Sequence, residues 1–257
     1  QLNSKDFPAN KKYAIPLSIT GASNYSLIPS QRSAILLLNR SILSSVAKVS
    51  GGEGIRIKPV GMHTKAEWTI QMSAIYSSLT RSNLTTAYLS NGTGGEFYTR
   101  ISSTAGIQVK NGRDGDDTWT QIPLQAGKWL HITYVHKDKK TTVYVNGKVQ
   151  KVFENSAITF GENSMIVVGN SGYRNDYLRE IRLWDKALTE SEINDYLYLP
   201  MDPATPHLIS YLPLSKEMET KDLKAPAGTE NVTTKARIEY VENVKFPADE
   251  LVIVNQE

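Results

Sequence analysis

The chain has 257 residues, of which 40% are hydrophobic, and this is enough to bury a sizeable core. Its 29 basic and 26 acidic side chains leave a net charge of +3 and are mixed along the sequence, which argues against a nucleic-acid-binding surface. The absence of cysteine excludes disulfides, a thiolate zinc site and a cysteine nucleophile, and no apolar run approaches the roughly 20 residues of a membrane span.

Two short strands are predicted near the beginning, over residues 13–20 and 33–39, with a loop at 21–30 between them. Pro16 in the first strand predicts an edge position or a bulge, because proline has no N–H to donate to a neighbouring strand. Two strands alone make a marginal domain. The opening residues Gln1-Leu-Asn-Ser-Lys-Asp resemble the inside of a protein, so we expect a segment upstream of them.

The next part of the chain alternates between apolar and polar residues, as strands do. Residues 54–60 alternate until Pro59, and Gly51-Gly52 before them suits a domain boundary or a tight turn. Residues 67–76 alternate in the same way. Further short strands are expected at residues 86–90, 96–101 and 106–110, with polar loops at 91–95 and 111–117.

Residues 125–152 carry the clearest structural pattern of the chain. Leu130, Ile132 and Tyr134 fall on one side of a strand, and Trp129, His131, Thr133 and Val135 fall on the other. After a charged reversal, residues 141–145 form a β-branched strand, and Asn146-Gly147 supplies the two positive-φ positions of a type I′ turn. Three consecutive antiparallel strands are therefore predicted.

The last third of the sequence predicts strands and a single helix. Residues 164–169 are apolar and β-branched, 171–177 read as a loop, and 177–184 read as a strand. Thr189-Glu-Ser-Glu192 is a capping box that starts a helix running to about Leu197. Late strands are expected at residues 207–214, 236–246 and 251–254, with loop at 215–234.

Two of these stretches resemble a known family. The middle of a laminin-G-like, or concanavalin A-like, jelly-roll domain resembles the Trp129-x-His-x-Thr strand with its Val-Tyr-Val-Asn-Gly147 hairpin. The end of such a domain resembles Leu178-Arg-Glu-Ile-Arg-Leu-Trp184 and the helix that follows it. The resemblance implies an all-β sandwich with one short helix over residues 43–257. Residues 1–42 resemble the end of a small β-sandwich found upstream of such domains in Bacteroidetes surface lipoproteins; the alternative is an extension that pairs with the main sandwich.

The residues predict a protein that is not an enzyme. Family 16 glycoside hydrolases of this fold carry Glu-x-Asp-x-x-Glu on one strand, and that pattern is absent here. The four histidines are scattered and show no ligand spacing, and there is no Gly-x-Ser-x-Gly or phosphate loop. His131 matches a strand histidine of the family, whose usual role is structural.

Calcium is the one candidate cofactor. Laminin-G-like domains often hold Ca²⁺ at one rim, and Ca²⁺ takes six to eight oxygen ligands. Asp114, Asp116 and Asp117, on the most polar loop of the chain, are the candidate ligands. The alternative is an ordinary solvated turn.

Loop aromatics with polar neighbours are the candidates for glycan binding, because sugars stack apolar C–H faces on rings and pair their hydroxyls with polar groups. The loop with Tyr173, Arg174, Asn175 and Asp176 ranks first. The remaining candidates are Trp119, Tyr98 and Arg100. For Trp119 the alternative is that its ring alternates into the core.

The resemblance implies a surface-exposed lipoprotein of a glycan-foraging Gram-negative bacterium, on the outer membrane or secreted, with its lipid anchor upstream. Its expected role is non-catalytic capture of an oligosaccharide or polysaccharide for a glycan-utilisation system, with other outer-membrane glycan-uptake proteins as candidate partners. The alternatives are a protein–protein or adhesion module and a glycoside hydrolase with atypical carboxylates.

Overall fold

The computed structural model describes residues 13–21, 33–38, 41–52, 54–61, 65–80, 85–88, 95–110, 115–154, 158–169 and 173–255. Its elements in chain order are β1 (Tyr13–Ser18), β2 (Ser33–Leu38), β3 (Ile42–Gly51), β4 (Ile55–Ile57), β5 (Trp68–Ile75), β6 (Thr85–Tyr88), β7 (Gly95–Ser102), β8 (Gly106–Lys110), η2 (Asp116–Thr118), β9 (Trp129–Lys137), β10 (Lys140–Val145), β11 (Lys148–Glu154), β12 (Met165–Val168), β13 (Tyr173–Trp184), α1 (Glu190–Asp195), β14 (Leu208–Leu212), β15 (Val232–Thr234) and β16 (Arg237–Phe246).

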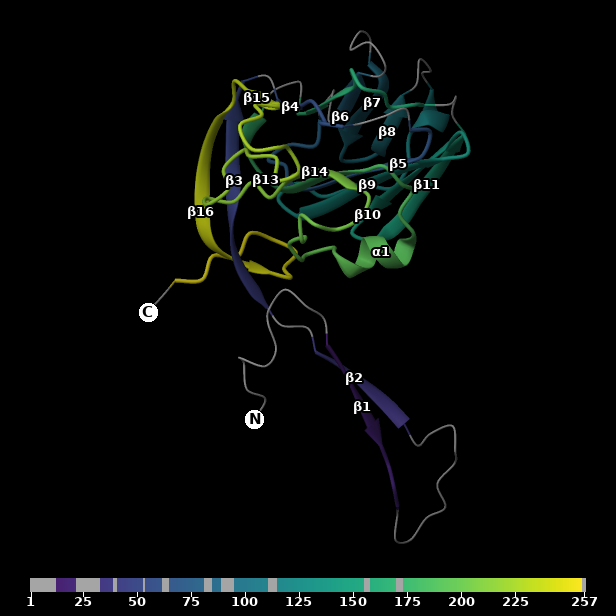
Figure 1. Ribbon diagram of the computed structural model, residues 1–257. Coiled ribbons are helices and arrows are strands. Elements are labelled where there is room, and N and C mark those ends of the chain that lie inside the picture. The colour runs from purple at the N-terminus through teal and green to yellow at the C-terminus, as the bar shows by residue number, and fades with distance from the viewer. Residues whose placement is uncertain are drawn as a thin grey trace.

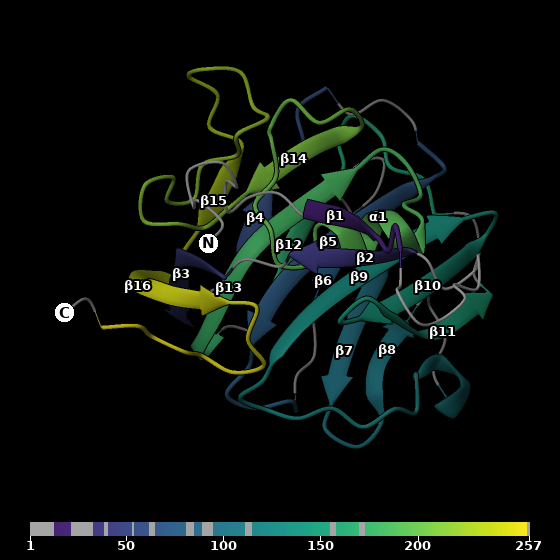
Figure 2. The ribbon, with the colours of Figure 1, turned by 90° about the horizontal axis from the view of Figure 1, so that it is seen from below.

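Two antiparallel sheets form a sandwich, as Figures 1 and 2 show. One sheet has the order β11-β10-β9-β5-β13-β3-β16, with β14 added alongside β13, and the other has the order β15-β4-β12-β6-β7-β8. The predicted all-β architecture with one short helix is therefore confirmed.

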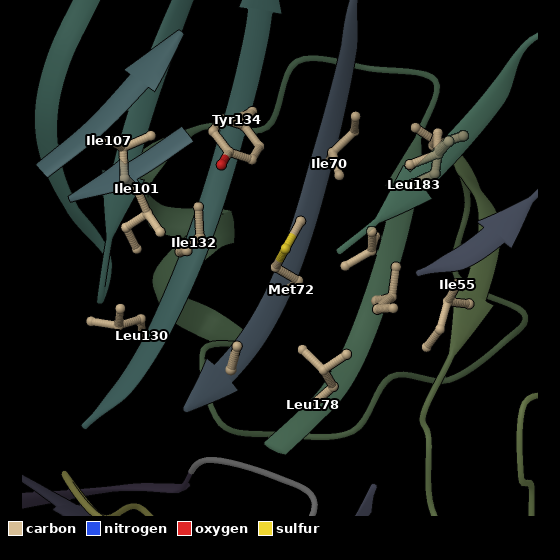
Figure 3. Packing of buried hydrophobic residues seen from close by; sticks show 14 of the residues in the cluster. Ile55, Ile70, Met72, Ile101, Ile107, Leu130, Ile132, Tyr134, Leu178 and Leu183 are labelled. Atoms are coloured by element: carbon tan, nitrogen blue, oxygen red, sulfur yellow. The ribbon is translucent and has the colours of Figure 1, made fainter. Parts of the chain in front are cut away.

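The main core lies between the two sheets and follows the predicted alternation. Met72 of β5 and Ile132 of β9 face Ile101 and Ile107 of the six-stranded sheet, and each of these side chains is almost completely buried (Figure 3). Burying one such side chain contributes about 1.5–3 kcal/mol to the stability of the fold.

The outer face of the eight-stranded sheet is buried as well, which alternation alone does not predict. Trp129 packs with Leu199 and Phe246 at one end of the face. Trp184 packs with Met201, among others, at the other end. Every residue of β5 is consequently buried, on both faces of the sheet.

The hairpin turn and the helix cap form as predicted. Asn146 and Gly147 have φ angles of +51° and +75°, and the Asn146 side chain accepts a hydrogen bond from the His131 N–H. Both hydrogen bonds of the Thr189–Glu192 capping box are present, although α1 ends at Asp195, two residues before the predicted end.

The local structure differs from the prediction in four places. Residues 251–254, predicted as a strand, form only an isolated bridge between Ile253 and Val244. β3 was not predicted, because its serines and lysine interrupt the apolar pattern, yet it pairs with β13 on one side and β16 on the other. β13 begins at Tyr173, so most of the predicted loop at 171–177 is strand. The short edge strand β15 lies within the predicted loop at 215–234.

β1 and β2 form a two-stranded sheet of their own, which projects away from the sandwich in Figure 1. Pro16 lies opposite Ile35 in this ribbon, and a two-stranded ribbon consists only of edge strands, as the proline predicted. The assignment of residues 1–42 to an upstream module stays a prediction. Across the described part of the chain, no helix is long and apolar enough to cross a membrane.

Candidate functional site

An aromatic and basic surface lies on the outer face of the six-stranded sheet, at β7 and β8. Phe97, Ile101 and Val109 of these strands belong to the core, so the alternate residues face outward. Tyr98 pairs with Lys110 and Arg100 pairs with Gln108 across the two strands, and Gln108 is bridged in turn to Trp119. We call this surface, made of Tyr98, Arg100, Gln108, Lys110 and Trp119, the Trp119 platform.

Arg100 is held in place by its neighbour on the same strand. Its Nε donates to the Tyr98 hydroxyl at 3.0 Å, and its guanidinium carbon lies 5.3 Å from the centre of the Tyr98 ring. Both side chains are half-buried. The Nε hydrogen bond leaves the two terminal amino groups of Arg100 without a hydrogen-bond partner among the described residues. They form a planar donor fork that suits a carboxylate or a sulfate.

The backbone around Trp119 is fixed from both sheets. Lys151 of β11 donates to the carbonyl oxygens of Asp117 and Trp119, at 2.8 and 2.7 Å. The Thr118 hydroxyl donates to the Gly115 carbonyl at 2.6 Å, and the Thr120 N–H donates to the Ile107 carbonyl. The half-exposed Trp119 ring therefore extends from a rigid segment, so little ordering entropy is lost when a ligand stacks on it.

Gln108 forms the floor between Arg100 and Trp119. Although it belongs to the outward-facing row, only 2% of it is exposed, and its Nε2 donates to the Thr118 hydroxyl at 2.8 Å. Its Oε1 has no hydrogen-bond partner among the residues that the structure describes. An unpaired buried acceptor costs about 1–3 kcal/mol. Because Gln108 is buried, it supports the platform from below.

The predicted glycan residues fall into two groups. Trp119, Tyr98 and Arg100 come together on the platform, whereas Tyr173, Arg174, Asn175 and Asp176 lie at the start of β13 in the other sheet. The side chains of Tyr173 and Arg174 lie outside the described part of the structure, while Asn175 is exposed at a bulge with φ of +60°.

Asp176 corrects the sequence-based ranking. Its side chain is fully buried, and its Oδ1 accepts hydrogen bonds from the N–H and the hydroxyl of Ser77, at 2.8 and 3.0 Å. The carboxylate thus ties the end of β5 to β13 and is not presented to a ligand at the surface. Its position within a strand rather than a loop is the physical reason.

The calcium prediction stays a prediction. Asp114 lies outside the described residues, as does the side chain of Asp116, and Asp117 is exposed within η2. The residues that the structure describes contain no group of three His, Cys, Asp or Glu side chains that could hold a metal ion.

A buried polar stripe under the segment after α1 was missed by the sequence analysis. Two rows cross the outer face of the eight-stranded sheet, His131–Ser73–Arg179 and Thr133–Gln71–Arg182, and all six side chains are buried. The Ser73 hydroxyl and His131 Nδ1 are 2.6 Å apart. Burial, followed by the charges of Arg179 and Arg182, lowers the pKa of His131 to about 3.

The carboxylate in this stripe is engaged by its neighbours. Glu180 pairs with Arg179 and Arg182 and accepts a hydrogen bond from the Tyr211 hydroxyl at 3.0 Å. The adjoining cavity has a volume of about 10 Å³, which is room for one water molecule. A saccharide has no access to this stripe, so it supports the fold.

A second cavity, of about 520 Å³, lies inside the loop formed by residues 219–232. Its lining residues include no aromatic side chain on which a sugar could stack. Asp222 in its wall accepts hydrogen bonds from Ser210, Tyr211, Lys224 and Asn231 and is therefore structural. The Trp119 platform is thus the better candidate for ligand binding.

Comparisons with known proteins agree with this architecture. A candidate carbohydrate-binding protein from Bacteroides ovatus ATCC 8483 superposes with a TM-score of 0.60 and 17% identity, over 93% of this chain and 71% of that one. A heptameric SAP-like pentraxin from Limulus polyphemus superposes with a TM-score of 0.52 and 12% identity, over 77% of this chain and 94% of that one. At these identities the likeness concerns the fold.

A search of curated proteins finds no match. The family model described as the concanavalin A-like lectin/glucanases superfamily, of laminin G type, matches residues 50–194, which is more than half of the chain. The two stretches that carried the resemblance in the sequence lie within this range. The chain therefore belongs to the concanavalin A-like lectin/glucanases superfamily.

Proposed function

We propose that this protein binds an oligosaccharide or polysaccharide on the Trp119 platform and does not cleave it. The observation that carries the proposal is the row formed by Arg100, Gln108 and Trp119, in which the half-exposed Trp119 indole and the Arg100 guanidinium lie on either side of Gln108. An apolar sugar face stacks on the first, and hydroxyl or acidic groups hydrogen-bond to the second.

Two features support binding without catalysis. The platform residues carry no carboxylate, whereas most glycosidases need a pair of them on either side of the scissile bond. The buried Glu180 is engaged by two arginines and a tyrosine. The superposition on the Bacteroides ovatus protein, itself a candidate carbohydrate-binding protein, favours the same assignment.

We further propose that the protein works at the bacterial surface, held by a lipid anchor upstream of this chain. There it would deliver captured glycan to uptake proteins of the outer membrane. The family resemblance of residues 1–42 supports this setting. Surface labelling of intact cells with a membrane-impermeant reagent tests it, and a protein protected from the label would contradict it.

A glycan array followed by isothermal titration tests binding. Trp119→Ala is expected to weaken affinity about tenfold or more, which is about 1.4 kcal/mol, because it removes the stacking surface. Tyr196→Ala is the matched control, since Tyr196 is an aromatic residue that is 37% exposed and lies on the other sheet's side of the molecule. Binding that survives Trp119→Ala, or is lost equally in Tyr196→Ala, would refute the platform.

A protein–protein or adhesion module is the second candidate, and the N-terminal ribbon favours it. Leu17 and Ile35 of this ribbon are 50% and 67% exposed, and a two-stranded ribbon is marginal by itself. This candidate would be favoured over glycan binding if Ile35→Asp abolished attachment to a protein partner and Trp119→Ala left that attachment unaffected.

A further inference from the structure

Charge is distributed unevenly around the Trp119 platform. Arg100 and Lys110 belong to the platform, and Lys151 approaches it from β11, with its Nζ on the carbonyl oxygens of Asp117 and Trp119. The platform residues themselves include no carboxylate, and Asp114, Asp116 and Asp117 precede Trp119 in the sequence.

Arg100 is better suited to an anion than to neutral hydroxyls. Its Nε donates to the Tyr98 hydroxyl at 3.0 Å, and its guanidinium carbon lies 5.3 Å from the centre of the Tyr98 ring, so Tyr98 orients the remaining fork before a ligand arrives. A guanidinium with parallel N–H groups makes paired, charge-assisted hydrogen bonds to a carboxylate or sulfate, which are about twice as strong as bonds to neutral acceptors.

The spacing suits a saccharide that carries an anionic group. Arg100 and Trp119 lie two strands apart in one row, which places their Cα atoms about 10 Å from each other. A ligand ring stacked on Trp119 therefore has its neighbouring group above Arg100. Gln108, which pairs with both residues, lies between the two contacts.

We infer that the Trp119 platform selects saccharides with an anionic substituent, a carboxylate or a sulfate ester, which Arg100 binds while a sugar ring stacks on Trp119. This inference rests on the proposed carbohydrate-binding function and specifies its ligand class.

Two matched pairs of probes test the inference by isothermal titration. One pair is oligogalacturonide and its methyl-esterified, neutral counterpart; the other is a sulfated carrageenan oligosaccharide and its desulfated counterpart. The anionic member of at least one pair is expected to bind about ten- to a hundredfold tighter than its neutral twin. The pair with the larger ratio identifies whether the anion is a carboxylate or a sulfate.

Variants then assign the preference to Arg100. Arg100→Gln is expected to abolish the affinity ratio between each anionic probe and its neutral twin, with a larger fold loss of affinity for the anionic probe than for the neutral one. Arg100→Lys keeps the charge but loses the fork, so it is expected to restore only part of the ratio. The matched control is Arg237→Gln, which removes the same charge from the exposed edge strand β16, far across the eight-stranded sheet from β11. Thermal midpoints of all variants establish that each is folded.

The outcomes separate this inference from the proposed function. Equal binding of twin probes, or equal effects of Arg100→Gln and Arg237→Gln, would overturn the anionic preference, and Trp119-dependent binding would leave the proposed function standing. If no saccharide binds the wild-type protein, the proposed function fails and the inference fails with it.

Discussion

Replacing Arg182 with methionine is expected to destabilise the protein strongly. The Arg182 side chain is 3% exposed and donates to the carbonyl oxygens of Tyr196 and Leu199, at 3.0 and 2.6 Å, as well as to Glu180. Methionine fills much of the space but leaves the Glu180 carboxylate without its nearest counter-charge. Removing one partner of a buried ion pair costs about 3–5 kcal/mol, because the other charge stays buried.

The expected loss is a large share of the roughly 5–15 kcal/mol by which a domain is stable, and it corresponds to a fall in Tm of about 10 °C for a chain of this size. Urea unfolding and calorimetry at pH 7.5 measure it. Hydrogen exchange is expected to show the amides of residues 196–201 opening first, since Arg182 holds that segment on the sheet. The double variant Arg182→Met/Glu180→Gln should recover part of the loss. A loss below about 1 kcal/mol, or no recovery in the double variant, would refute this account of the clamp.

Three other predictions follow from buried or strained positions. The pKa of His131 is lowered from 6.5 to about 3 in the fold. The contribution of the neutral imidazole to stability is therefore complete above pH 6.5, and it is lost by about 1.4 kcal/mol per pH unit as the pH falls toward 3. Urea unfolding at pH 7.5 and pH 5 should show this slope, and His131→Gln should flatten it. A slope that is unchanged in the variant would contradict the assignment. Gly147→Ala is expected to lower the free energy of unfolding by about 2 kcal/mol or more, because φ is +75° and the new Cβ would meet Asn194 Oδ1 at 2.1 Å. Gly228→Ala is the control, since φ there is +82° but nothing lies within 4 Å of the new Cβ. Thermal unfolding should show a smaller loss for the control. Asp176→Ala is expected to lower stability by about 1–3 kcal/mol and to leave saccharide affinity unchanged, since the Asp176 carboxylate binds Ser77. A variant that keeps its Tm but loses affinity in titration would show that Asp176 does contact ligand.

Local chemistry explains which parts of the fold could be predicted from the sequence. Asn146-Gly147 and Thr189-Glu-Ser-Glu192 satisfy their own backbone geometry within a few residues, so both were recognised and both form. β3 was missed because its register is set by β13 and β16, which lie more than a hundred residues further along the chain. The strand propensities of single residues carry no information about such distant pairing.

The candidate site divides in the same manner. Tyr98 and Arg100 were recognised as polar and aromatic neighbours on one strand, which is a local pattern. Trp119 joins their row through its bridge to Gln108 and through Lys151 from the other sheet. Neither contact can be predicted from the sequence. Asp176 was misjudged because its loop-like composition, Arg-Asn-Asp, occupies a strand with a bulge.

The two anchors of Trp119 also have a mechanical consequence. Its backbone is joined to β8 through the bridge at Gln108, and to the edge strand β11 of the opposite sheet through Lys151. Tension applied through a long polymer seated on the indole would therefore be shared between the edges of both sheets. A tryptophan attached to a single edge strand would pass the whole load to that strand.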